Sequence, residues 1–267
     1  MPTISVIIPV YNDAKYISET LDSVISQTFA DWEAICVNDG STDGSLKILK
    51  KYAKKDSRIK IINQKNQGVI VARNNAIKKA ISEYIFMLDG DDKIAPTTFE
   101  KMYNAIISGK GDIITSRVMR FGRETGEMIL PNPNKVNMAN TNCLVNAALM
   151  KKEDFFACGG FDERFSSMLE DYDLWLNLLY EQNKKFYRIP EILFFYRIKP
   201  KNLSRNYRHR DTDLKDIIKL LQIKYPIRKW HRISNILHYP KRVLHFFFRI
   251  QNGYIKIFKI PVKRTVK

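Results

Sequence analysis

The chain has 267 residues, 45% of them hydrophobic, which is enough for a sizeable core in one or two domains and argues against a disordered protein. Its formal net charge of +17 predicts an anionic partner, such as phosphorylated substrates, lipid headgroups or nucleic acid. Most of this charge lies in residues 205–267, which hold 17 Lys and Arg against 3 Asp.

Features that reveal the compartment are few. Cys36, Cys143 and Cys158 are too widely spaced for a CxxC pair and predict free thiols in a reducing compartment. No charged leader with an apolar stretch begins the chain, and no run of about 18 apolar residues occurs, so we expect neither a secretion signal nor a spanning helix. The expected location is cytoplasmic, with any membrane contact peripheral and at the inner face.

Short β-rich runs alternate with segments of helical period over residues 1–115, which is typical of an α/β fold with a mainly parallel sheet. We expect helices at 69–81 and 96–107, and strands at 4–10, 33–37, 59–62, 84–88 and 113–115. In such sheets, ligands bind at the carboxyl ends of the strands, so residues that follow a strand are the candidates for chemistry.

The alternation ends near residue 116. Residues 116–165 are expected to form substrate-facing loops, which would include a hairpin between 118–121 and 128–130. A helix through 172–179 and a strand at 192–197 follow, and two further helices are predicted at 214–223 and 233–250.

The first two strands end in polar loops. The first ends in Pro9-Val10-Tyr11-Asn12-Asp13 instead of GxGxxG, which disfavours a dinucleotide site of the Rossmann type. The second ends in Asn38-Asp39-Gly40-Ser41-Thr42-Asp43, which by itself indicates no more than a capped turn before a helix.

Carboxylates gather at two later places. Asp89-Gly90-Asp91-Asp92 follows the fourth strand, and this crowding of negative charge favours a hard divalent cation such as Mg²⁺ or Mn²⁺. The alternative is a solvated acidic turn at a helix start. Glu170-Asp171 begins the later helix, where Asp171 is either a general base or one of several acids that suit a first helical turn.

Taken in order, these motifs resemble one family. They are residues 5–12, 39–43, 68 with 72–74, 89–92, 159–162 and 170–171. They resemble the family 2 glycosyltransferases of GT-A fold, over about residues 3–204. The resemblance implies a catalytic domain at 1–204, with a nucleotide-sugar half at 1–115 and an acceptor and catalytic half at 116–204, followed by a basic helical extension at 205–267.

The resemblance also implies roles for single residues. Those expected to bind the nucleotide sugar are Pro9, Val10, Tyr11, Asp39, Gly68, Arg73, Asp89, Gly90, Asp91 and Lys199. Asp39 would face the uracil or equivalent base, and Arg73 would lie near the base and the phosphates. Asp89 and Asp91 match the DxD motif: Asp91 would bind Mn²⁺ or Mg²⁺ directly, and Asp89 would help through the ribose or a metal-bound water.

For catalysis, the resemblance implies that Asp171, with Glu170 beside it, is the base of the ED motif. Asp171 would take the proton of an acceptor hydroxyl as this attacks the anomeric carbon, opposite the leaving diphosphate. The cation would stabilise the negative charge that develops on the diphosphate, so its removal should abolish turnover. Such a displacement inverts the anomeric configuration.

The chain departs from the family pattern at Lys199. Members often have a metal-ligating His two residues after the Tyr-Arg of the late strand, whereas Lys199 follows Tyr196-Arg197-Ile198 here. A protonated ammonium group cannot ligate a metal. Lys199 therefore contacts the diphosphate directly, with fewer protein ligands left for the metal, or it belongs to a solvated loop.

Residues 205–267 mix cations with aromatic side chains, which suits an interfacial helix on an anionic membrane. Single-stranded nucleic acid is a less favoured partner, because no nucleic-acid motif accompanies the segment. Part of it could instead pack on the catalytic domain or form an oligomer.

The sequence thus predicts a glycosyltransferase that moves a sugar, with a UDP-sugar as the expected donor, to a lipid-linked or surface glycan. The alternative is a non-catalytic protein that binds nucleotides or nucleic acid.

Overall fold

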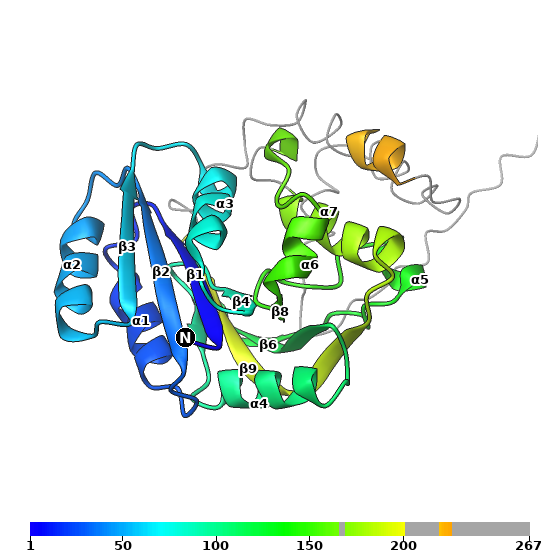
Figure 1. Ribbon diagram of the computed structural model, residues 1–267, viewed down its shortest axis with the longest axis horizontal. Coiled ribbons are helices and arrows are strands. Elements are labelled where there is room, and N and C mark those ends of the chain that lie inside the picture. Colours follow the sequence, from blue (N-terminus) through cyan, green and yellow to red (C-terminus); the bar gives the residue numbers. More distant parts are fainter. Residues whose placement is uncertain (166–168, 201–218, 226–267) are drawn as a thin grey trace, which may run out of the picture.

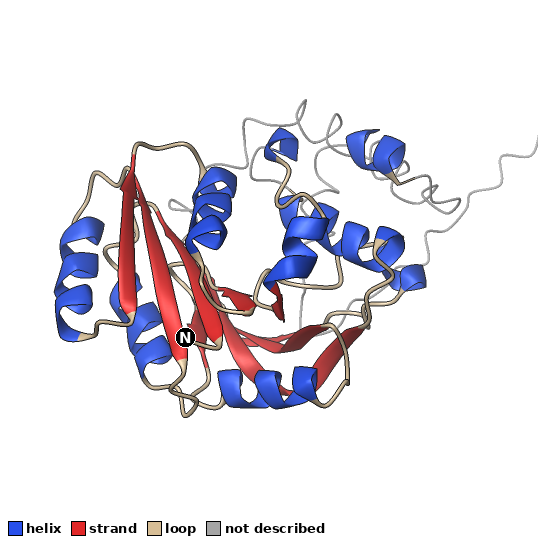
Figure 2. Ribbon diagram, viewed as in Figure 1, coloured by secondary structure: helices blue, strands red, loops and turns tan. Residues whose placement is uncertain are grey.

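A mixed nine-stranded sheet with helices on both faces organises the computed structural model, which describes residues 1–165, 169–200 and 219–225 (Figures 1 and 2). The strand order is β3-β2-β1-β4-β8-β6-β9-β5, and β7 pairs with β6 outside this path. This is the α/β arrangement that the alternation of runs predicted.

The parallel half of the sheet consists of β1 (Ile4–Val10), β2 (Trp32–Asp39), β3 (Ile59–Gln64) and β4 (Tyr84–Met87). Every residue of β1, β2 and β4 is buried. Strands that are covered on both faces are apolar along most of their length, which is why these runs could be recognised in the sequence.

The other half is mixed and contains β5 (Lys93–Ile94), β6 (Ile113–Gly122), β7 (Gly126–Met128), β8 (Leu149–Lys151) and β9 (Phe186–Ile198). Strand β8 is antiparallel to β4 and β6, whereas β6 and β9 are parallel. The predicted hairpin is confirmed as β6 and β7, but β6 and β9 are longer than expected because each is extended by pairing with the other.

Seven α-helices lie within residues 1–165 and 169–200. They are α1 (Ile17–Ile25), α2 (Ser45–Lys55), α3 (Val69–Lys79), α4 (Thr98–Ile107), α5 (Lys135–Met138), α6 (Lys152–Ala157) and α7 (Glu170–Leu176). The helix predicted through 172–179 is α7 followed by a π-helical turn, Asn177–Glu181. None of the described helices is long and apolar enough to cross a membrane.

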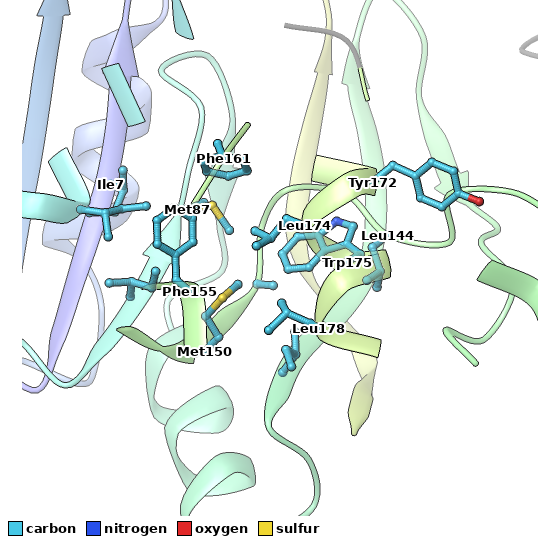
Figure 3. Packing of buried hydrophobic residues seen from close by; sticks show 14 of the residues in the cluster. Ile7, Met87, Leu144, Met150, Phe155, Phe161, Tyr172, Leu174, Trp175 and Leu178 are labelled. Carbon is cyan, nitrogen blue, oxygen red and sulfur yellow. The ribbon is translucent and has the colours of Figure 1, made fainter. Parts of the chain in front are cut away.

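Two hydrophobic cores lie on the two faces of the sheet, because successive side chains of a strand point to opposite faces. On β1, Val6 joins Ile4 and Ile8 in one core with α1 and α4, whereas Ile7 joins the other. Figure 3 shows this second core, in which Ile7 belongs to one cluster with Phe155 of α6 and Trp175 of α7. The cluster thereby joins α7 to the parallel strands.

Residues 219–225 belong to this second core. Residues 219–224 are helical, and Leu221 and Tyr225 are each 1% exposed within the cluster that contains Trp175. A folded segment beyond residue 204 thus packs on the part of the chain that precedes it. The predicted helix at 214–223 is described only from residue 219, and the one at 233–250 lies outside the described residues.

Candidate active site

The loops that follow β1 and β2 meet at one edge of the sheet and are tied together. The Asn12 backbone N–H donates to Ser41 Oγ at 3.1 Å, and the Thr42 N–H donates to Asn12 Oδ1 at 2.8 Å. Asn12 adopts a positive φ of 57°, a conformation that Asn tolerates better than most residues. The carboxyl ends of both strands are thus held as one surface.

Asp39 lies under this surface. Its carboxylate accepts from Gln64 Nε2 at 2.8 Å and from the backbone N–H groups of Gln67 at 2.9 Å and Gly68 at 2.8 Å. Asp39 therefore fixes the loop that leads into α3, while Pro9 and Val10 are buried in β1. Tyr11, in contrast, is open to solvent, with 48% of the residue exposed.

Arg73 on α3 connects the two acidic motifs. It is 4% exposed, and its Nη2 donates to Asp89 Oδ1 at 2.7 Å while its Nη1 donates to Glu170 Oε1 at 2.6 Å. Burial alone would lower the pKa of Arg73, but the two carboxylates raise it above its ordinary value. Two motifs that are far apart in sequence thus share one buried cation.

The neighbouring Asn74 holds the loop after α6. Its Nδ2 donates to the Phe161 carbonyl at 2.9 Å, and its Oδ1 accepts from the Phe161 N–H at 3.1 Å. Gly160 has a φ of 80°, and a Cβ there would lie 3.3 Å from Asn74 Oδ1, so the tight approach favours glycine. This explains why a glycine stands at position 160, directly before Phe161.

Lys199 lies between two aspartates instead of in a solvated loop. Its Nζ is 3.0 Å from Asp13 Oδ1 and 2.9 Å from Asp91 Oδ2. Burial alone would lower the pKa of Lys199, but Asp91 and Asp13 raise it above its ordinary value, so the amine carries a proton. A Cβ at Gly90 would lie 3.1 Å from the Pro9 carbonyl oxygen and 3.2 Å from Asp13 Oδ2, so this close approach favours glycine.

The backbone of β9 is bonded to the same acidic loop. The Arg197 N–H donates to Asp92 Oδ1 at 2.7 Å, and Arg197 Nε donates to the Asp91 carbonyl at 2.6 Å. Asp92 is 2% exposed, and burial together with the charges of Asp91 and Asp89 raises its pKa well above the ordinary value. The end of β9 is therefore fixed beside the DxD sequence.

Asp171 differs from Asp89, Asp91 and Glu170 because no cation of the described residues contacts its carboxylate. Its Oδ1 accepts from the Tyr172 N–H at 2.7 Å, and its Oδ2 accepts from Asn142 Nδ2 at 3.3 Å. Desolvation, and secondly the charge of Glu170, raise the pKa of Asp171 to about 7. Leu169, directly before α7, has a φ of 60°, a strained backbone of the kind found at functional sites.

The acidic loop does not form a ready metal site. Within residues 1–165, 169–200 and 219–225, no three or more His, Cys, Asp and Glu side chains are grouped so that they could hold a metal ion. Asp89 Oδ1 is paired with Arg73, and Asp91 Oδ2 is paired with Lys199. The oxygen donors suit Mg²⁺ or Mn²⁺ chemically, but the carboxylates of Asp89 and Asp91 each contact a cation of the chain already.

Sequence reasoning missed several residues of this region. Asp13 completes the pair around Lys199, and Asn142 donates to Asp171 from a loop that carries no recognisable motif. Lys224 and Tyr225 donate to Asp173 of α7, at 2.8 Å and 2.9 Å. Asp13 ends the polar run that follows the first strand and could have been noticed, whereas the other contacts depend on the tertiary fold.

Comparison with known proteins agrees with this geometry. The model of the family "Glycosyl transferase family 2" matches residues 5–227. The chain belongs to glycosyl transferase family 2. The match confirms the predicted glycosyltransferase class and extends past residue 204 to the segment that contains Leu221 and Tyr225.

Individual relatives are consistent with this membership. The chain is 33% identical to the O-antigen biosynthesis glycosyltransferase WbnJ of Escherichia coli, over 76% of this chain and 82% of WbnJ. It is 32% identical to the putative glycosyltransferase EpsE of Bacillus subtilis, over 72% of each chain. Other relatives are longer, and the match spans only 36% of GlyA from Streptococcus pneumoniae.

Solved structures confirm the GT-A fold. Staphylococcus aureus TarS 1–349 in complex with UDP-GlcNAc has a TM-score of 0.71 and 23% identity, over 96% of this chain and 76% of TarS 1–349. The mannosyltransferase PcManGT of Pyrobaculum calidifontis, in complex with GDP-Man and Mn²⁺, has a TM-score of 0.63 and 19% identity, over 89% of this chain and 68% of PcManGT.

Proposed function

We propose that this glycosyltransferase moves a sugar from a UDP-sugar to a hydroxyl group of a surface or lipid-linked glycan, with inversion and with Asp171 as general base. The observation that carries the proposal is the bridge from Arg73 to Asp89 and Glu170, which joins the donor edge of the sheet to the start of α7. A donor at this edge and a base on α7 then face one reaction centre.

The donor would lie across the loops that follow β1, β2 and β4. Tyr11 offers an exposed ring against the base, Asp39 lies beneath the loop at Gly68, and Gly90 and Asp91 lie at the phosphate end. UDP is favoured as the nucleotide because TarS, a structural neighbour over nearly the whole chain, was solved with UDP and with UDP-GlcNAc.

The chemical step requires one proton transfer to the protein. The acceptor oxygen forms a bond to the anomeric carbon, its proton passes to Asp171, and the bond to the diphosphate breaks with its electron pair on UDP. A carboxylate whose pKa is about 7 is well matched to this task, because it is ionised in part at neutral pH and still basic. Attack opposite the leaving group inverts the anomeric carbon.

The Mn²⁺ or Mg²⁺ implied at Asp89 and Asp91 stays a prediction. Metal use is common in the family, and PcManGT was solved with Mn²⁺. The two carboxylates of this chain are paired with Arg73 and Lys199, so no step is assigned to a metal here.

The setting follows from the relatives and from the basic extension. WbnJ is named for O-antigen biosynthesis, and TuaG of Bacillus subtilis, 45% identical over 38% of this chain, for teichuronic acid biosynthesis. A surface-glycan acceptor assembled at the inner face of the cell membrane is therefore proposed. Residues 205–267 would bind the anionic membrane through side chains other than the buried Leu221 and Tyr225, although most of the range lies outside the described residues.

The testing experiment is a panel of UDP- and GDP-sugars with a lipid-linked acceptor, in which nucleotide release is measured. We expect turnover of one UDP-sugar, and turnover that is lower by about 10²- to 10⁴-fold in Asp171→Asn. Absence of turnover and of any thermal shift with every nucleotide sugar would contradict the proposal. Vesicles with and without anionic lipid, tested with the full chain and with a chain that ends at Tyr225, address the membrane contact separately.

A further inference from the structure

We propose that the Lys199 ammonium group is the built-in cation of the donor site: it holds the place at Asp91 where a divalent ion would bind and contacts the donor diphosphate itself. The inference rests on the proposed function and concerns how that same site neutralises its substrate. It departs from the expectation that metal removal abolishes turnover.

The geometry of the ammonium group supports this role. A protonated lysine has three N–H donors, and two of them are directed at Asp13 Oδ1 and Asp91 Oδ2, at 3.0 Å and 2.9 Å. The side chain keeps 26% exposure, so the third donor is available to a phosphate oxygen. The ring of Tyr16, centred 5.2 Å from Nζ, adds a favourable cation–π contact.

The fold fixes the position of Lys199 at the end of a strand. Residue 199 directly follows β9, whose Arg197 backbone N–H is bonded to Asp92 Oδ1 at 2.7 Å. The Arg197 guanidinium lies 4.7 Å from the centre of the Tyr16 ring and 4.2 Å from that of the Phe121 ring. With the strand end held at these points, the lysine side chain has a short route to Asp91.

The charges around Lys199 also support its role as the cation of the donor site. Asp13 and Asp91, whose side chains are 11% and 18% exposed, bring two negative charges to one place with little water to screen them. A cation between them offsets this repulsion, and Lys199 supplies it at 3.0 Å and 2.9 Å. A divalent ion at Asp91 would have to displace the ammonium and then remain beside it, so the free protein should bind Mn²⁺ weakly.

The chemical consequence concerns the leaving group. As the bond between the anomeric carbon and the diphosphate oxygen breaks, the electron pair stays on that diphosphate. The third N–H of Lys199 donates to a phosphate oxygen and stabilises this charge without giving up its proton. No oxidant, reductant or further reactant is needed.

The experiment combines Mn²⁺ binding with turnover in the full chain. Bound Mn²⁺ is measured by electron paramagnetic resonance, with and without UDP, for the wild type, Lys199→His and Lys199→Met. Lys101→Met is the control, because Lys101 pairs with Glu191 on the surface and lies outside the donor site. Turnover of the UDP-sugar is measured with EDTA and with Mn²⁺.

We expect the wild type and Lys101→Met to turn over in EDTA and to bind Mn²⁺ weakly. Lys199→Met should lose about 100-fold or more of its turnover in EDTA. Lys199→His, which replaces the ammonium with a metal ligand, should bind Mn²⁺ about tenfold or more tightly and depend on it for turnover. UDP binding measured by thermal shift shows whether each variant is folded.

The inference is overturned if the wild type binds Mn²⁺ as tightly as Lys199→His and EDTA abolishes its turnover. In that result the transferase activity itself still stands, because turnover occurs with Mn²⁺. Failure of the proposed function looks different: no UDP-sugar is turned over under either condition.

Discussion

Two groups of carboxylates in this molecule differ in the groups that contact them. At the donor edge, Asp91 is paired with Lys199 and Asp89 with Arg73, so each of these two carboxylates has a cation within 3.0 Å. At the start of α7, Glu170 shares Arg73, whereas the hydrogen bonds that Asp171 accepts within the described residues come from neutral donors, the Tyr172 N–H and Asn142.

This difference in contacts gives each group of carboxylates its own task. Pairing with a cation lowers the pKa of a carboxylate, although burial and the charge of Asp89 keep the pKa of Asp91 above its ordinary value. Asp89 and Asp91 serve to hold cations, phosphates and loops in place. A carboxylate that is desolvated and paired with neutral groups binds a proton readily, and the pKa of Asp171 is accordingly raised to about 7. If the tasks are separate, mutations in one group should leave the function of the other intact.

The largest effect is expected from Asp171→Asn. Asparagine keeps the size of the side chain and its bond from the Tyr172 N–H but cannot take a proton, so turnover should fall by about 10²- to 10⁴-fold. UDP affinity should stay unchanged, because Asp171 belongs to the other group. Steady-state kinetics and a UDP titration measure the two quantities.

The control for this variant is Asp22→Asn, at an exposed position on α1 that bonds the Tyr52 hydroxyl. It should keep normal turnover and UDP affinity. A comparable loss in both variants, or a loss of UDP binding in Asp171→Asn, would show that the two carboxylate groups are not independent.

The second prediction removes the cation that the two groups share. Arg73→Met leaves the carboxylates of Asp89 and Glu170 without their buried partner, which should lower the free energy of unfolding by about 3–5 kcal/mol. Denaturant titration measures this loss. Arg73→Lys should recover only part of it, because an ammonium lacks the planar fork that reaches both acids.

A loss below about 1 kcal/mol in Arg73→Met would mean that solvent already screens the bridge. The two carboxylate groups would then be joined by packing, through the core cluster of Figure 3, and not by charge.

The sequence predicted the strands and the acidic motifs better than it predicted the partners of the acidic side chains. The parallel strands were recognisable because strands covered on both faces are largely apolar, and their motifs follow the strands directly. The family resemblance pointed to Asp91 and Asp171. The partners that separate their tasks were not predictable, because Lys199 reaches Asp13 across 186 residues and Asn142 lies in a loop without a motif.

The third prediction concerns pH. Since Asp171 must be ionised to act as base, kcat/KM should rise with pH and level off above a midpoint of about 7. Glu170→Gln removes a like charge that raises this pKa and leaves Arg73, which lowers it, so the midpoint should move down. An unchanged midpoint would exclude Asp171 as the titrating group.

The same shift affects stability. The pKa of Asp171 is raised above its unfolded value, so between pH about 4 and about 7 the folded chain binds more protons than the unfolded chain. This group therefore lowers the free energy of unfolding as pH rises through that window. Asp171→Asn should remove this part of the pH dependence in thermal unfolding.

The smallest loss of stability is expected from the contacts between α7 and residues 219–225. The Tyr225 hydroxyl donates to Asp173 Oδ1 at 2.9 Å, and Lys224 Nζ lies 2.8 Å from Oδ2 of the same buried carboxylate. Tyr225→Phe removes one of these partners and keeps the ring packing, so we expect a loss of about 1 kcal/mol in thermal or denaturant unfolding.

Ile223→Ala is the matched control for this segment, because Ile223 is 71% exposed and its truncation should leave stability nearly unchanged. A double-mutant cycle of Tyr225→Phe with Asp173→Asn isolates the bond from other effects. If the coupling is absent, residues 219–225 do not brace α7. If the coupling is present and Tyr225→Phe also lowers turnover, the position of Asp171 depends on residues 219–225, which lie outside the sheet. Packing would then position the base, whereas ion pairs position the donor site.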